Sequence, residues 1–191
     1  VPESSGAAGE VTYQAMRVTC GQSIKNAAGL GSMGFGLPYA IGSCLAMNRR
    51  RTILINGDGA FQLNIQELET VRRLQLPIKM FILDNGGYGG IVATQRNMFD
   101  GFLVGADASS GFTLPDVCAV AKAYKIRTWE ILTNGDLAEG LAEVLSGDDP
   151  VLCRIVVRRE HLTQPKVQAM KLPDGGMVSK PLEDMWPYLP A

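Results

Sequence analysis

Hydrophobic residues along this chain occur in two alternating patterns, short continuous runs and stretches with helical spacing. The continuous runs are rich in Val, Ile and Leu, which is typical of strands buried on both faces of a parallel sheet. We expect these strands over residues 52–56, 78–83, 126–131 and 151–157. Helices are expected over residues 37–47, 64–74, 114–124 and 136–145. This alternation predicts an α/β fold, with a doubly wound, mostly parallel sheet and helices on both faces.

The remaining segments suggest how the chain is organised. Residues 1–17 are rich in Ser, Gly and Pro and resemble an interdomain linker, so we expect a fragment of a longer protein. Residues 18–160 are expected to form the folded domain, and the proline-rich residues 161–191 an extended C-terminal tail. Asn64, with Glu67 three residues later, is the expected N-cap of the helix over 64–74.

Composition excludes several classes of partner. The chain is 46% hydrophobic with a net charge of −1, so nothing favours a nucleic acid or an anionic membrane as partner. No apolar stretch approaches the roughly 18 residues of a membrane span. The four cysteines lie far apart, which favours a reducing, cytoplasmic location. His161 is the only histidine, so a histidine metal cluster is excluded.

Two polar motifs follow neighbouring apolar runs. Gly57-Asp58-Gly59 follows the first run and Asp84-Asn85-Gly86 ends the second, with one helix between them. Parallel sheets bind ligands at the carboxyl ends of their strands, and Mg²⁺ prefers oxygen ligands while keeping phosphates among them. Taken alone, the first motif is equally typical of a tight turn without a ligand, and the second of a hairpin turn. Together they favour a magnesium and diphosphate site.

A third glycine motif, Gly29-x-Gly31-x-x-Gly34, formally matches the dinucleotide-binding fingerprint. That fingerprint needs a strand before it and an acidic residue about 20 positions later. Neither is present, because residues 23–26 form a poor strand and arginines occupy the later position. A nicotinamide site is therefore rejected.

These motifs together resemble a known family. GDG, one helix and an Asn-ended strand resemble the GDG…NN signature of thiamine diphosphate (ThDP) enzymes, and GSMGFGLPYAIG resembles the GAMGFGLPAAIG stretch of acetolactate synthases. The resemblance covers roughly residues 20–160. It implies the C-terminal, diphosphate-binding domain of an acetolactate synthase-like enzyme, without its pyrimidine-binding and central domains.

The resemblance also implies roles for individual residues. Asp58, the Asn85 side chain and the Gly87 carbonyl are implied to hold Mg²⁺, and Met33 is implied to support the bent cofactor. Ordinary core packing is an equal alternative for Met33. The whole implied cofactor-binding set is Gly31, Ser32, Met33, Asp58, Gly59, Ala60, Asn85, Gly87 and Tyr88. No catalytic residue is expected in this chain, because the family's activating glutamate comes from the pyrimidine-binding domain.

The implied reaction is decarboxylation of a 2-keto acid and transfer of the acyl unit to a second carbonyl. Alternatives are a ThDP-dependent decarboxylase, oxidase or cyclic-diketone hydrolase, or a non-catalytic ThDP-binding module. The complete enzyme is expected to be a homodimer or homotetramer in which the same or a partner subunit supplies the pyrimidine-binding domain. FAD is possible in the full-length protein, and the isolated chain is expected to be inactive.

Two positions depart from the family pattern. Asp84 stands where the family has its first Asn, and its added negative charge near phosphates is unfavourable unless it is paired or turned away. Gln95 stands where acetolactate synthases carry a tryptophan that helps select the second keto acid. Gln95 is therefore a candidate substrate residue.

Overall fold

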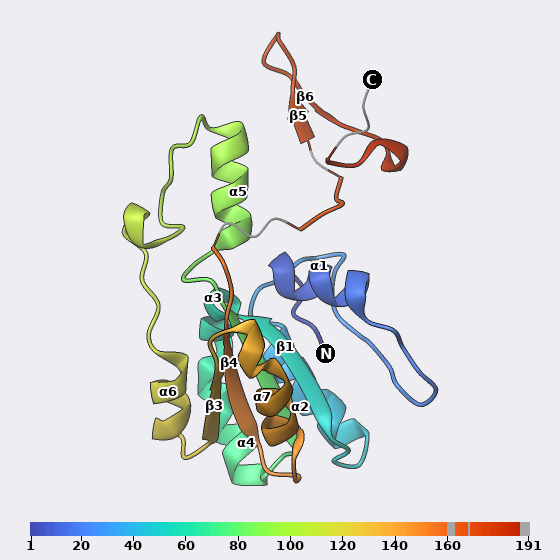
Figure 1. Cartoon of the computed structure of the whole chain (residues 1–191), viewed down its shortest axis with the longest axis vertical. Helices are drawn as coiled ribbons and strands as arrows, with labels where there is room; N and C mark the ends of the chain where they lie inside the picture. Colours follow the sequence, from blue (N-terminus) through green and yellow to red (C-terminus); the bar gives the residue numbers. More distant parts are fainter. Residues whose placement is uncertain (160–162, 168, 188–191) are drawn as a thin grey trace.

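The computed structural model describes residues 1–159, 163–167 and 169–187, so His161 lies outside the described residues (Figure 1). A four-stranded parallel sheet forms the centre, with strand order β1-β2-β4-β3. The strands are β1 (Thr52–Gly57), β2 (Ile78–Asp84), β3 (Arg127–Ile131) and β4 (Val151–Val156). All four predicted strands are confirmed, as is the α/β fold class.

Successive residues of β1, β2 and β4 pack into two separate cores. Met80 and Ile82 of β2 face one core, which contains residues of helices α2, α4 and α6. Phe81, between them, faces the other core, which contains residues of α7. These helices are α2 (Gly36–Ala46), α4 (Leu68–Leu74), α6 (Val117–Ala123) and α7 (Leu137–Leu145). The continuous apolar runs are therefore explained by helices that cover both faces of the sheet.

The helical segment between β1 and β2 starts earlier than predicted. It consists of α3 (Asp58–Phe61), the 3₁₀ helix η1 (Gln62–Glu67) and α4. The prediction that Asn64 is an N-cap is wrong, because Asn64 lies inside η1 with φ −136° and ψ 30°. Its side-chain amide instead donates to the Gly34 carbonyl at 2.7 Å. The helix thus begins directly at Asp58, at the end of β1.

The N-terminal segment expected to be a linker is folded onto the sheet. Pro2 forms a parallel bridge with Ile55, and the Glu3 N–H donates to the Ile55 carbonyl at 2.8 Å. Helix α1 (Gly6–Ala15) follows. The physical reason is that β1 is an edge strand whose backbone groups need partners, and residues 1–3 supply them.

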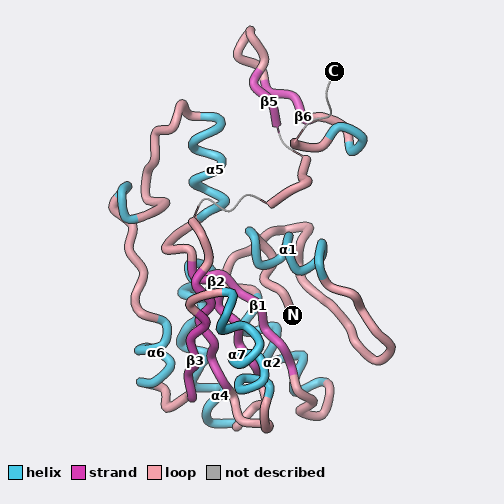
Figure 2. The backbone as a smooth tube through the Cα atoms, viewed as in Figure 1, coloured by secondary structure: helices cyan, strands magenta, loops and turns pink. Residues whose placement is uncertain are grey.

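Two regions lie away from the sheet (Figure 2). The chain between β2 and α6 contains helix α5 (Gly89–Met98) and the 3₁₀ helix η2 (Ala108–Ser110). The described part of the tail forms a small antiparallel hairpin and one 3₁₀ turn. The remaining elements are η3 (Asn134–Asp136), β5 (Ala169–Lys171), β6 (Met177–Ser179) and η4 (Leu182–Asp184). The Gln14 side chain connects α1 to this region by donating to the Pro165 carbonyl at 2.9 Å.

Lys79 holds the opposite, amino-terminal end of the sheet together. The residue is fully buried, and its ammonium donates to the carbonyls of Ser146 and Asp149 at 3.2 and 2.6 Å. Burial lowers the pKa of Lys79, with smaller contributions from the nearby Arg127 and Arg51. The contacts join β2 to the loop that follows α7.

Lys79→Met is expected to lower the free energy of unfolding by about 2 kcal/mol, because two carbonyls lose a charged donor. Urea denaturation measures this change. Lys122→Met, on the exposed side of α6, is the matched control and should change the free energy by less than about 0.5 kcal/mol. Equal effects of the two substitutions would contradict the role given to Lys79.

Candidate functional site

The two predicted motifs meet at the carboxyl edge of the sheet. Gly57 at the end of β1 pairs with Leu83 of β2, so the residues that follow both strands leave the sheet side by side. Asp58 is only 3% exposed. Its Oδ1 accepts the Gly59 N–H at 2.8 Å, and its Oδ2 accepts the N–H groups of Gly86 and Gly87 at 2.8 and 3.2 Å. One carboxylate thus joins the two motifs.

The electrostatics of Asp58 follow from its burial. Burial raises the pKa of Asp58 to about 6, the N–H groups of Gly59 and Gly86 oppose this shift, and the neighbouring carboxyl of Asp84 adds to it. Asp84 itself is paired with Arg154 of β4. The unfavourable charge anticipated at position 84 is therefore balanced by a cation within the sheet.

The loop after β2 depends on a glycine at position 87. Gly87 has φ +156°, and a Cβ atom there would lie 2.5 Å from the Ala106 carbonyl oxygen. The same carbonyl accepts the Tyr88 N–H at 2.8 Å, and the Asn85 side chain accepts the Gly87 N–H at 3.2 Å. This loop is thereby held against residues 106–107.

Gly59 and Tyr88 pack directly against each other. A Cβ atom on Gly59 would lie 2.5 Å from the Tyr88 ring, whose other neighbour is the Phe112 ring at a centroid distance of 4.4 Å. Only a residue without a side chain fits beneath the ring at position 59. The close approach keeps the turn after β1 in contact with the loop after β2.

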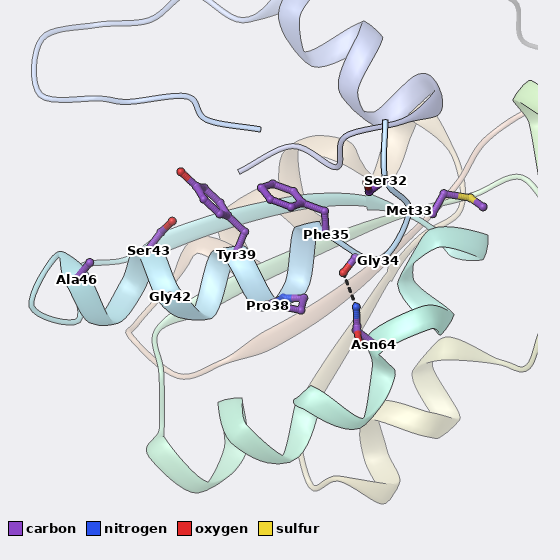
Figure 3. Close-up of a pocket in the computed structure, with 10 residues that line it drawn as sticks. All are labelled: Ser32, Met33, Gly34, Phe35, Pro38, Tyr39, Gly42, Ser43, Ala46 and Asn64. Atoms are coloured by element: carbon purple, nitrogen blue, oxygen red, sulfur yellow. Dashed lines mark hydrogen bonds between the residues drawn. The ribbon is translucent and has the colours of Figure 1, made fainter. Parts of the chain in front are cut away.

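The glycine-rich turn before α2 borders a cavity of about 680 Å³ (Figure 3). Phe35 and Tyr39 stack along the exposed side of α2, with ring centroids 4.7 Å apart. Ser32 and Met33 lie at one end of the cavity and Ala46 at the other. The hydrogen bond from Asn64 to Gly34 attaches this turn to η1.

Comparison with known proteins decides the family. Residues 5–155 match the family described as "Thiamine pyrophosphate enzyme, C-terminal TPP binding domain". The chain belongs to this family. Thiamine pyrophosphate is another name for ThDP, so the predicted family is confirmed.

Individual relatives agree with this assignment. The chain is 34% identical over 161 residues to acetolactate synthase isozyme 2 large subunit of Escherichia coli, a match that covers 83% of this chain and 27% of that protein. It is 33% identical over 142 residues to the acetolactate synthase large subunit of Cyanidium caldarium, covering 74% and 24%. The chain thus spans about a quarter of the length of these relatives.

The oxygen groups at the edge fit the magnesium site of a TPP-binding domain. Asp58 offers a carboxylate, Asn85 an amide oxygen and Gly87 a carbonyl, which are ligand types that Mg²⁺ prefers. Within the described residues, no three His, Cys, Asp or Glu side chains gather as a metal cluster.

The structure also distinguishes between the roles considered for two side chains. Met33 belongs to neither core and is 38% exposed, so the alternative of core packing does not apply. Gln95 exchanges two hydrogen bonds with the backbone of Val104, at 3.2 and 3.0 Å. The amide of Gln95 thus attaches α5 to the loop that follows it.

The start of α1 also lies at this edge, which the sequence did not predict. Residues 1–3 run parallel to β1, so Ser4 and Ser5 leave the sheet at the same edge as Asp58. The Ser4 hydroxyl is buried and has no hydrogen-bond partner in the described part of the chain. The only local signal was a Ser pair before Gly6, which is typical of a helix start as well as of a linker.

Gly87→Ala is expected to lower the free energy of unfolding by about 1–3 kcal/mol, because the new methyl group clashes with the Ala106 carbonyl at an unfavourable φ. Gly90→Ala is the matched control, since it is in α5 with open space around it, and should be neutral or stabilise by up to about 1 kcal/mol. Thermal unfolding measures both. A stable Gly87→Ala variant would show that the loop is not constrained as described.

Proposed function

We propose that this domain holds Mg²⁺ and ThDP in an enzyme that decarboxylates a 2-keto acid and transfers the acyl unit to a second carbonyl. The names of its acetolactate synthase relatives support this reaction class. The observation that carries the proposal is the buried Asp58 carboxylate, which meets the Asn85 loop at the carboxyl edge of the sheet. Such an edge is where α/β sheets bind phosphorylated cofactors.

Each group at the edge has a separate task in this proposal. Asp58, Asn85 and the Gly87 carbonyl hold Mg²⁺, and the backbone at Gly59 and Ala60 lies along the diphosphate. Gly31, Ser32, Met33 and Tyr88 complete the cofactor-binding set. When bound, ThDP supplies the electron sink that decarboxylation of a keto acid requires.

The other components of the active site are proposed from outside this chain. A glutamate of a pyrimidine-binding domain, on the same or a partner subunit, activates the cofactor in a homodimer or homotetramer. FAD in a further domain and a cytoplasmic location are two further proposals that are compatible with this function. One maize relative is named "Acetolactate synthase 2, chloroplastic". Within the described residues, no helix is long and apolar enough to cross a membrane.

A simple ThDP-dependent decarboxylase is the second candidate. The observation that favours it is Gln95, which stands in place of the expected tryptophan and is already hydrogen-bonded to Val104. Without an aromatic side chain at this position, a second keto acid lacks the contact that the tryptophan is expected to provide. Product analysis with pyruvate distinguishes acetaldehyde from acetolactate.

Asp58→Asn in the full-length protein is expected to weaken magnesium-dependent ThDP binding by roughly 100-fold or more, because Mg²⁺ loses its charged ligand. Isothermal titration calorimetry with ThDP in excess Mg²⁺ measures this. Asp148→Asn, an exposed position paired with Arg51, is the control and should bind normally. Normal binding by Asp58→Asn would rule out the ligand assignment.

Gln95→Trp is expected to change the ratio of products formed from pyruvate alone and from pyruvate with 2-ketobutyrate. The reason is that the substitution removes both hydrogen bonds to Val104 and adds a large ring at the implied acceptor position. The product ratio by chromatography is the measurement. An unchanged ratio would remove Gln95 from the substrate site.

A further inference from the structure

Asp84 and Asp58 share one hydrogen-bond donor. The Gly86 N–H lies 2.8 Å from Oδ2 of Asp58 and 3.1 Å from Oδ1 of Asp84. Two carboxylates this close disfavour each other's ionised form unless a cation balances them. The negative charge of Asp84, beside the proposed metal site, therefore needs a balancing cation.

Arg154 provides the balancing cation from the neighbouring strand. Arg154 pairs in register with Ile82 of β2, so its side chain shares a sheet face with Asp84, two residues further on. Its Nε donates to Oδ2 of Asp84. Its Nη1 donates to Glu130 of β3 at 2.9 Å, which fixes the guanidinium on the side away from β1.

These groups border a cavity next to the proposed metal ligand. A cavity of about 410 Å³ is lined by Asp58, Asp84, Gly86 and Arg154, among others. The carboxyls of Asp84 and Asp58 already lie within hydrogen-bonding reach of each other. The cavity leaves open space for Asp84 to move further toward the proposed metal position if it is released from Arg154. The hydrogen bond to Arg154 is what holds its carboxylate on the β4 side.

We propose that Arg154 is a positioning residue that keeps the Asp84 carboxylate out of the magnesium coordination sphere. The inference rests on the proposed function. Mg²⁺ has about six ligand positions, of which substrate phosphates occupy some, so a second carboxylate would displace a phosphate oxygen. Its charge would also repel the diphosphate. The Asp84–Arg154 pair has no net charge, so in this proposal it replaces the neutral asparagine expected at position 84.

The test compares three variants of the full-length protein by titration calorimetry with ThDP in saturating Mg²⁺. Arg154→Gln is expected to weaken ThDP binding by about tenfold or more, because Asp84 is left unbalanced beside the phosphates. Asp84→Asn combined with Arg154→Gln is expected to restore binding to within about threefold of the wild type. Arg127→Gln, which breaks a similar ion pair between Arg127 of β3 and Glu143 of α7, is the control and should bind normally.

A merely structural role for Arg154 gives a different pattern. In that case the double variant stays as weak as Arg154→Gln, and this result overturns the inference, as does normal binding by Arg154→Gln. Asp84→Asn alone is a second test if Arg154→Gln does not fold: equal or tighter binding supports the inference, and a tenfold loss overturns it. Wild-type protein that binds no ThDP would instead overturn the proposed function itself.

Discussion

One buried carboxylate connects the ends of the two strands that carry the site. Asp58 accepts N–H groups from its own turn and from the loop after β2, so the positions of both loops depend on it. A carboxylate that is 3% exposed is costly to ionise, and three N–H donors offset only part of that cost. In the proposed function Mg²⁺ offsets the rest. The group that organises this edge is therefore also the group that a divalent cation stabilises most.

The glycine-rich turn before α2 is fixed from both ends by polar side chains that are distant in sequence. Asn64 donates to the Gly34 carbonyl, and the fully buried Glu3 accepts the Gly36 N–H at 3.0 Å. Glu3 is itself held beside β1 by its backbone hydrogen bond to Ile55. The turn that carries Met33 is thus positioned relative to the same strand that ends at Asp58. Two separate parts of the proposed cofactor-binding set are therefore positioned by β1.

Local sequence pattern predicted the sheet because its strands are buried on both faces. In β2, residues 80–83 are apolar without a break, and its first five residues are buried, as in a strand covered on both faces. The same reasoning missed features that depend on distant partners. Asn64 bonds to a residue 30 positions away, and residues 1–3 are ordered by pairing with β1. Helix α5 escaped prediction because it buries only Val92 and so lacks an apolar face.

The meeting of the two glycine motifs at one sheet edge was predictable because both motifs follow apolar runs directly, whereas the electrostatic balance at this edge was not. Asp84 was recognised as an added charge, but its partner Arg154 lies 70 positions later and is brought near only by the strand order β2–β4. From the sequence alone, Arg154 cannot be distinguished from an arginine that is exposed to solvent. Strand order is the information that a single sequence does not contain, and here it decides whether position 84 disrupts the site or supports it.

The carboxylates near the site are each held by contacts within the domain, which bears on where proton transfer takes place in the proposed function. Asp58 is bound by backbone N–H groups, Asp84 by Arg154, and Asp107 by the Ser109 hydroxyl at 2.6 Å and by Arg159 at 3.7 Å. Each of these carboxylates is thus committed to holding structure or, in the proposed function, metal. A proton-transfer acid must be close to its substrate and have a pKa matched to the reaction. These carboxylates are already engaged by contacts within the domain. The proposed function accordingly assigns proton transfer to a glutamate of a pyrimidine-binding domain, and metal and diphosphate binding to this chain.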